Sequence, residues 1–249
     1  MKPKICILKT DGTNCDQETK FAFEKAGGQA DIVLLNHLKK NSSLLHEYHI
    51  LVIAGGFSYG DDVASGVILA TELLVHLKKE IQQFIAQQKL IIGICNGFQV
   101  LVRTGLLPAG TMEIQNVALI ENDSGHFQCR WVDMVVEKSP CVFTKSLEGQ
   151  KISLQVAHAE GKCFTSPKVL SQCKEQELIP LRYTSNTNPN GALENIAGLC
   201  DKTGRIFGLM PHPERFIDRF AHPNWRRNKN QPIGLTIFEN AVTYIKENR

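Results

Sequence analysis

The sequence predicts an α/β fold: a parallel or mixed central sheet flanked by helices, with a smaller antiparallel β segment. Strand-like runs at Lys4–Lys9, Ala30–Leu35 and His49–Ala54 alternate with helical or polar stretches, a pattern typical of parallel sheets. The continuous apolar run from Leu90 to Ile92 suits a strand buried on both faces. After Gly110, strand-like runs follow one another with turns between them, which indicates antiparallel pairing.

Length and composition favour one globular domain over residues 1–249. Hydrophobic residues make up 43% of the chain and charged residues 21%. A net charge of +3 is too small to indicate nucleic-acid binding. No apolar run reaches about 18 residues, and the chain leads straight into a strand, so we expect a cytoplasmic protein without membrane association. The eight cysteines include no Cys-x-x-Cys pair, so we expect neither a metal site nor a disulfide framework.

The first helix is expected to run to about Ala26, before Gly27–Gly28. Thr13 or Asn14 can cap it, and Asn14 and Gln17 stand at capping-box spacing.

Between the second and third strands we expect a polar segment around Lys39–Ser43. Leu73–Gln88 then predicts one amphipathic helix that leads into the buried strand.

The second half of the chain is rich in predicted strands. They cover Asn116–Glu121, His126–Val136, Lys151–Ala157 and Leu178–Tyr183. Gly191–Cys200 and Arg205–Met210 predict a hairpin, and a helix from about Gly234 to Arg249 ends the chain.

A sharp turn is expected at Cys95, where the buried strand meets a helix. Gly93 and Gly97 bracket Cys95, and this Gly-x-Cys-x-Gly spacing is the thiol counterpart of a nucleophile elbow. A helix N-terminus favours the thiolate, and the backbone N–H of Asn96 would face a developing oxyanion. The spacing also fits a buried packing cysteine, so a base elsewhere in the chain must decide between the two readings.

A glycine pair, Gly55–Gly56, directly follows the third predicted strand. A loop at the carboxyl end of a parallel strand can present N–H groups to an anion, at the edge where the Cys95 turn opens. This loop is either the second half of an oxyanion hole or a flexible turn, and it lacks the phosphate-loop pattern.

His212 and Glu214 follow the last predicted strand. The flanking prolines fix the backbone and end the strand. A histidine can take a proton from a thiol, and a carboxylate two residues later can orient its ring. A lone histidine in such a turn is more often a surface residue, but the strand-end placement of Cys95 and His212 predicts a Cys95–His212–Glu214 triad.

Five motifs occur together in one known family. They are Gly-Gly-Phe-Ser-Tyr-Gly-Asp from Gly55, Gly-Ile-Cys-Asn-Gly-Phe-Gln from Gly93, Phe-Gln-Cys-Arg-Trp from Phe127, Ala-His-Ala-Glu-Gly from Ala157 and Met-Pro-His-Pro-Glu-Arg from Met210. Over nearly the whole chain, this combination resembles class I glutamine amidotransferases, and most closely the glutamine amidotransferase subunits of phosphoribosylformylglycinamidine synthase.

The resemblance implies a class I glutamine amidotransferase-like fold and hydrolysis of L-glutamine to glutamate and ammonia. Cys95 would attack the side-chain amide to form a γ-glutamyl thioester, His212 would shuttle protons, and Glu214 would orient His212. The implied oxyanion hole comprises Gly56, Phe57 and Asn96, and the implied glutamine contacts are Gln99, Asn122, Ser124 and Phe127.

The resemblance also implies a partner. The ammonia would pass to a synthase subunit that converts phosphoribosylformylglycinamide to phosphoribosylformylglycinamidine in purine biosynthesis, with or without a small third subunit. ATP and magnesium would bind that partner, so no cofactor is expected in this chain.

Three positions depart from the family pattern. His126 stands where arginine or lysine is usual, and Asp11 where proline is favoured. Ala159 replaces a glycine, so a positive φ there would be strained.

Two further features have two readings each. The resemblance implies that His158 and Glu160 lie near the active-site mouth or the synthase interface. The alternative is that His158 is a satisfied strand-end histidine, and neither residue is predicted to be catalytic. The basic stretch from Arg215 to Lys229 either docks an acidic partner or is a solvated face.

Two other functions stay open. One is a related α/β cysteine hydrolase, in which a histidine commonly follows the cysteine; Asn96 at that position disfavours it. The other is a non-catalytic scaffold subunit, which the intact triad disfavours.

Overall fold

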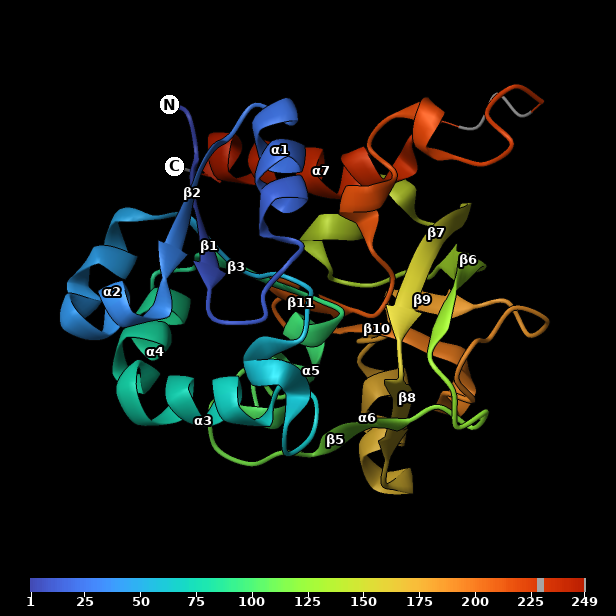
Figure 1. Cartoon of the computed structure of the whole chain (residues 1–249), viewed down its shortest axis with the longest axis horizontal. Helices are drawn as coiled ribbons and strands as arrows, with labels where there is room; N and C mark the ends of the chain where they lie inside the picture. Colours follow the sequence, from blue (N-terminus) through green and yellow to red (C-terminus); the bar gives the residue numbers. More distant parts are fainter. Residues whose placement is uncertain (228–230, 249) are drawn as a thin grey trace.

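A large mixed sheet forms the centre of the molecule in the computed structural model, which describes residues 1–227 and 231–248 (Figure 1). Its strands are β1 (Lys4–Lys9), β2 (Gln29–Leu34), β3 (Ile50–Ile53), β4 (Leu90–Ile94), β6 (Gln128–Val136), β7 (Lys151–His158), β9 (Leu181–Tyr183), β10 (Ile196–Cys200) and β11 (Ile206–Leu209). Their order is β2-β1-β3-β4-β11-β10-β9-β6-β7. Strands from β2 to β11 pair in parallel, and those from β11 to β7 pair antiparallel.

A second, two-stranded antiparallel sheet pairs β5 (Val117–Glu121) with β8 (Glu160–Thr165). The predicted α/β class, with its smaller antiparallel segment, is therefore confirmed. The predicted hairpin of β10 and β11 is also present.

Helices cover both faces of the sheet. They are α1 (Asp16–Lys25), α2 (Leu35–Lys40), α3 (Val67–His76), α4 (Lys78–Ala86), α5 (Asn96–Arg103), α6 (Pro167–Glu175) and α7 (Ile233–Asn248). Helices α1 and α7 lie together on one side, and α3 and α5 lie together on the other (Figure 1). Within the described ranges, no helix combines the length and apolar character needed to cross a membrane.

The core surrounds β3, β4, β10 and β11, in which every residue is buried. This agrees with their continuous apolar sequences, because a strand covered on both faces has no solvent-facing positions. Helix α5 packs on β3, β4 and β11, and all its residues except Arg103 are buried. The element that begins directly after Cys95 is therefore firmly held.

The prediction of one helix over Leu73–Gln88 is wrong. The chain forms α3 and α4, which meet at Leu77 with φ −127° and ψ 8°. Leu77 is buried, so the bend directs its side chain into the core. Helix α3 also begins earlier than predicted, directly after Gly66, whose φ of 76° sets the turn into the helix.

The predicted cap of the first helix is also wrong. Cys15, not Thr13 or Asn14, is the N-cap residue of α1, and it makes no side-chain capping bond. Thr13 pairs with Gly56 in an isolated bridge, and the Asn14 N–H donates to the Gly55 carbonyl (3.4 Å). The loop before α1 is therefore tied to the loop after β3 rather than to its own helix.

Several elements were not predicted from the sequence. Helix α2 begins where the second strand was expected to end, and β8 and α6 follow β7 without a matching prediction. The strand at β10 begins later than expected because a short turn over Leu193–Asn195 precedes it. The predicted end of the last helix, Arg249, lies outside the described residues.

Candidate active site

Cys95 sits at the turn between β4 and α5 in a strained conformation, with φ 51° and ψ −104°. A positive φ in a residue with a side chain costs about 1–2 kcal/mol. The two glycines explain how the turn fits: a Cβ on Gly97 would lie 1.9 Å from the Ile53 carbonyl oxygen, and one on Gly93 would lie 2.5 Å from the Gly97 carbonyl oxygen. The Gly-x-Cys-x-Gly spacing is thus a packing requirement of this turn.

The sulfur of Cys95 is enclosed. Only 4% of Cys95 is exposed, and its Sγ lies 3.5 Å from the carbonyl oxygen of Ala157 at the end of β7. The Cys95 N–H donates to the carbonyl of Leu209, the last residue of β11 (2.8 Å). The thiol therefore lies where β4, β11 and β7 end.

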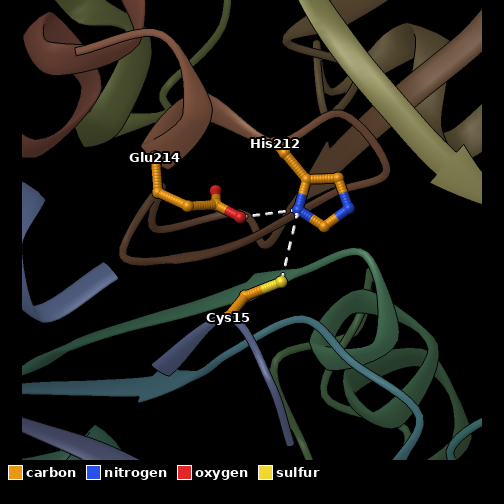
Figure 2. A group of neighbouring side chains, drawn as sticks. All are labelled: Cys15, His212 and Glu214. Atoms are coloured by element: carbon orange, nitrogen blue, oxygen red, sulfur yellow. Dashed lines mark hydrogen bonds and ion pairs between the residues drawn. The ribbon is translucent and has the colours of Figure 1, made fainter. Parts of the chain in front are cut away.

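His212 reaches the same edge because β11 is the parallel neighbour of β4. The backbone N–H of His212 donates to the Gln155 carbonyl on β7 (2.8 Å), which fixes the turn after β11. Its Nδ1 lies 2.6 Å from Oε1 of Glu214, and both side chains are buried (Figure 2). The other ring nitrogen, Nε2, has no hydrogen-bond partner among the described residues.

The electrostatic setting of His212 favours the imidazolium form. Burial alone would lower its pKa, but the Glu214 carboxylate, followed by Cys95, outweighs burial and raises the pKa of His212 well above its ordinary value. A histidine so arranged can accept a proton from a thiol and hold it beside a carboxylate.

Cys15 is a neighbour of this pair that the sequence interpretation missed. Its sulfur faces the His212 ring (Figure 2), with Sγ 4.0 Å from Nδ1. The sulfur also accepts a hydrogen bond from the Arg215 guanidinium (3.4 Å). One sequence signal could have pointed to it: Cys15 follows β1, whose carboxyl end lies at the same edge of the sheet as those of β4 and β11.

Cys15, His212 and Glu214 also carry the donor types of a metal site, with their donor atoms within 4.8 Å of one another. A tetrahedral metal ion would separate ligand nitrogen and oxygen by about 3.3 Å. The 2.6 Å separation between Nδ1 and Oε1 fits a shared proton instead. The expectation of no metal in this chain stays a prediction.

One backbone donor of the predicted oxyanion loop, the Phe57 N–H, already has an acceptor within the protein. The Phe57 N–H donates to the Gly12 carbonyl (2.9 Å), and Gly56 has φ 145°. The side chain of Asn96 joins this loop to the elbow, since its Oδ1 accepts from the Ser58 N–H (3.3 Å) and its amide donates to Asp61 (3.2 Å). The oxyanion assignment of Gly56, Phe57 and Asn96 stays a prediction.

The four predicted glutamine contacts are not alike. Gln99 and Asn122 are both buried. The side-chain amide of Gln99 donates to the backbone carbonyl of Glu160 (2.5 Å). That of Asn122 donates to the backbone carbonyls of His126 and His158 (2.9 Å each), so both amides already have acceptors within the protein. Ser124 is exposed and bonds within its own loop.

Phe127 is half-exposed and stacks on Phe57 at 6.3 Å between ring centroids. It therefore joins the loop before β6 to the predicted oxyanion loop. Contact of any of the four residues with glutamine remains a prediction.

His158 is a buried histidine whose Nδ1 lies 3.1 Å from the Asn122 carbonyl oxygen Oδ1. The Asn122 amide nitrogen donates to two carbonyls, so the atom that faces Nδ1 is the amide oxygen, which can only accept a hydrogen bond. Nδ1 must therefore carry the proton of the neutral ring. Glu160 lies 3.8 Å from Arg103 and accepts from the Ser65 N–H (3.3 Å). Ala159 is not among the residues with positive φ, so the strain considered there is absent.

The predicted basic stretch is only partly available to a partner. The Arg215 side chain is mostly buried beside Cys15, whereas Arg226 and Arg227 are exposed. Arg226 also lies over the Trp225 ring, 5.1 Å from its centroid. Lys229 lies outside the described residues.

Comparison with known proteins gives the family. The family model of the CobB/CobQ-like glutamine amidotransferase domain matches residues 2–245. The chain is 44% identical to phosphoribosylformylglycinamidine synthase subunit PurQ of Dehalococcoides mccartyi over 99% of each chain, and 39% identical to that of Methanococcus maripaludis over 98% of each. In the structure of PurLQS from Thermotoga maritima, one chain matches with a TM-score of 0.79 and 34% identity, covering 98% of this chain and 100% of that one. The chain therefore belongs to the glutamine amidotransferase family, in the group formed by the PurQ subunits of phosphoribosylformylglycinamidine synthase.

Proposed function

We propose that this enzyme subunit hydrolyses L-glutamine to glutamate and ammonia through Cys95, His212 and Glu214. The observation that carries the proposal is the arrival of the elbow cysteine and the His212–Glu214 pair at the ends of two adjacent parallel strands, β4 and β11. That edge is where α/β sheets place their chemistry.

The proposed reaction has two halves. Cys95 Sγ attacks the side-chain amide carbon while His212 holds the thiol proton, and the C–N bond breaks as that proton passes to the leaving nitrogen. Ammonia leaves and a γ-glutamyl thioester remains. Water then attacks the thioester with His212 as base, which releases glutamate and restores the thiol.

The proposed oxyanion hole needs a change in the loop. Because the Phe57 N–H bonds to Gly12, it cannot also donate to an oxyanion. A rotation of the peptide before Phe57, which Gly56 can accommodate, would turn this donor toward the substrate beside the Asn96 N–H. One missing donor costs about a hundredfold in turnover.

We further propose that the ammonia passes to a synthase partner that converts phosphoribosylformylglycinamide to phosphoribosylformylglycinamidine, as the names of the relatives suggest. ATP and magnesium would bind that partner. Free ammonia is protonated in water and lost as a nucleophile, so release should depend on docking. Whether a small third subunit joins the pair is part of the same test.

The test is glutamate release by the chain alone, with the synthase subunit, and with the small subunit added. We expect slow release by the chain alone, faster release with its partner, and no release by Cys95→Ala. Cys129→Ala, which removes an exposed thiol, is the matched control. Full activity without a partner would favour an independent hydrolase, and equal activity of Cys95→Ala would favour a scaffold.

A further inference from the structure

Glu214 carries an unusual buried atom. Its Oε1 accepts from His212, but its Oε2 is buried and has no hydrogen-bond partner within residues 1–227 and 231–248. An unsatisfied buried acceptor costs about 1–3 kcal/mol, and more when it is charged. A nearby cation would ordinarily relieve this cost by moving to the carboxylate.

Such a cation is close. The guanidinium of Arg215, the residue after Glu214, donates to Cys15 Sγ (3.4 Å), and its Nε lies 3.6 Å from Oε1 of Glu18. It is also near enough to feel the charge of Glu214. A carboxylate is a much better acceptor for guanidinium than a thiol sulfur. Cys15 and Glu18 therefore hold the guanidinium in place, and the Cys15 sulfur takes the donor nitrogen that could otherwise turn to Glu214.

Cys15 is itself fixed. Its S–H donates to the Asn14 carbonyl oxygen Oδ1 (3.3 Å), its N–H donates to the Gly55 carbonyl (3.1 Å), and only 1% of the residue is exposed. A Cβ on Gly55 would lie 3.3 Å from Cys15 Sγ and 2.8 Å from Cε1 of His212, so all three residues pack against one another.

We propose that Cys15 is a positioning residue that keeps the Arg215 guanidinium away from Glu214, so that the carboxylate serves His212 alone. The role assigned to His212 rests on the proposed function. A sulfur suits this role because it is large and accepts hydrogen bonds weakly. Its contact with Nδ1 of His212 is long (4.0 Å), so the Glu214 oxygen at 2.6 Å remains the main partner of Nδ1.

Removing the sulfur should let Arg215 advance. In Cys15→Ala the guanidinium can bind Oε2, which offsets the negative charge that favours the imidazolium form of His212. The pKa of His212 should then fall, and the basic limb of kcat/KM should move to lower pH. The titratable or charged groups around His212 are Cys15, Glu18, Cys95, His158, Glu214 and Arg215.

The experiment compares wild type, Cys15→Ala, Cys15→Ser, Arg215→Gln and the double variant Cys15→Ala/Arg215→Gln in complex with the synthase subunit. We expect kcat of Cys15→Ala to fall by about tenfold or more with KM little changed. The double variant should regain most of that loss, because the competing cation is gone. Cys15→Ser should be more active than Cys15→Ala but less active than wild type, because its hydroxyl still accepts from Arg215 but is smaller than the thiol. Cys6→Ala, which removes a buried thiol of β1, is the matched control.

A second readout does not need activity. NMR titration of ring-labelled histidine should show the midpoint of His212 lowered in Cys15→Ala and restored in the double variant. An unchanged midpoint in Cys15→Ala, or a loss that Arg215→Gln does not rescue, would overturn the proposal and leave Cys15 a packing residue. If the wild-type complex releases no glutamate, the proposed function fails, while the titration still decides the role of Cys15.

Discussion

The residue Cys95 combines a strained backbone with a sulfur placed at the end of three strands. Its reactivity should therefore exceed that expected from its low exposure. A glutamine-derived electrophile should label Cys95 alone among the eight cysteines, as mass spectrometry of tryptic peptides would show. Cys129 is exposed and provides the internal control. Labelling that follows exposure, with Cys129 first, would contradict a specially activated thiol.

His212 and Glu214 should contribute unequally. His212→Ala removes the proton acceptor, so turnover should fall by about a hundredfold or more. Glu214→Gln should reduce turnover less, because the amide can still hold the ring, and it should move the basic limb of the pH profile to lower pH, because the carboxylate raises the pKa of His212. Steady-state kinetics across pH tests both; negligible effects of both changes would refute the triad.

His158 should affect stability in acid. Burial, and then the charge of His212, lower the pKa of His158 to about 3. Between that value and about 6.5 the unfolded chain binds a proton that the folded chain does not. The stability that His158 contributes is therefore present above about pH 6.5 and lost as the pH falls toward 3.

His158→Gln should consequently reduce the decline in unfolding free energy between about pH 6.5 and 4, which urea denaturation would measure. His126→Gln, which changes an exposed histidine nearby, is the control. A decline as steep as that of wild type would show that His158 is not the group responsible.

At the scale of elements, the turn between β4 and α5 depends on the absence of one side chain. Gly-to-Ala changes inside helices usually stabilise by about 1 kcal/mol. In Gly97→Ala the new Cβ would meet the Ile53 carbonyl, so β3 and α5 must separate. We expect a loss of about 1–3 kcal/mol in unfolding free energy, measured by denaturant titration. A more stable variant would contradict this packing argument.

The sequence predicted the elements whose burial is visible in their own residues. Strand β4 is apolar throughout, and the Pro-His-Pro turn marks the end of the last strand, so both halves of the candidate site could be predicted. The break at Leu77 could not, because Leu77 continues the apolar periodicity of its neighbours. Strand β8 was missed because Gly161 and Thr165 occupy buried positions while the apolar Phe164 is exposed, which hides the alternation. Its backbone pairs with β5.

Contacts between residues far apart in the sequence could not be predicted either. Cys15 and His212 are 197 residues apart, and no local pattern connects them. The bond between the Phe57 N–H and Gly12 is likewise a backbone contact between two loops, which side-chain identities do not encode.

For the whole molecule, partner binding should involve the exposed arginines Arg226 and Arg227, which follow the turn that carries His212 and Glu214. Reversing the charge of Arg226 and Arg227 to glutamate should weaken activation by the synthase subunit and leave basal hydrolysis unchanged, since both side chains are exposed. The measurement is the rate of glutamate release as the synthase subunit is titrated into wild type and the variant. Lys202→Glu, a charge reversal in the β10–β11 turn, is the control, and an equal effect there would point to net charge rather than a docking surface.

The pairing of β4 with β11 has a consequence for how the molecule folds. These strands are separated by more than a hundred residues of chain, and nearly all of the antiparallel half lies between them. Parallel pairing over such a distance closes a long loop and is slow compared with hairpin formation. We therefore expect Cys95 and His212 to come together late, after β10 and β11 have formed their hairpin, so that during synthesis the Cys95 thiol has no histidine beside it until the chain beyond His212 has been made.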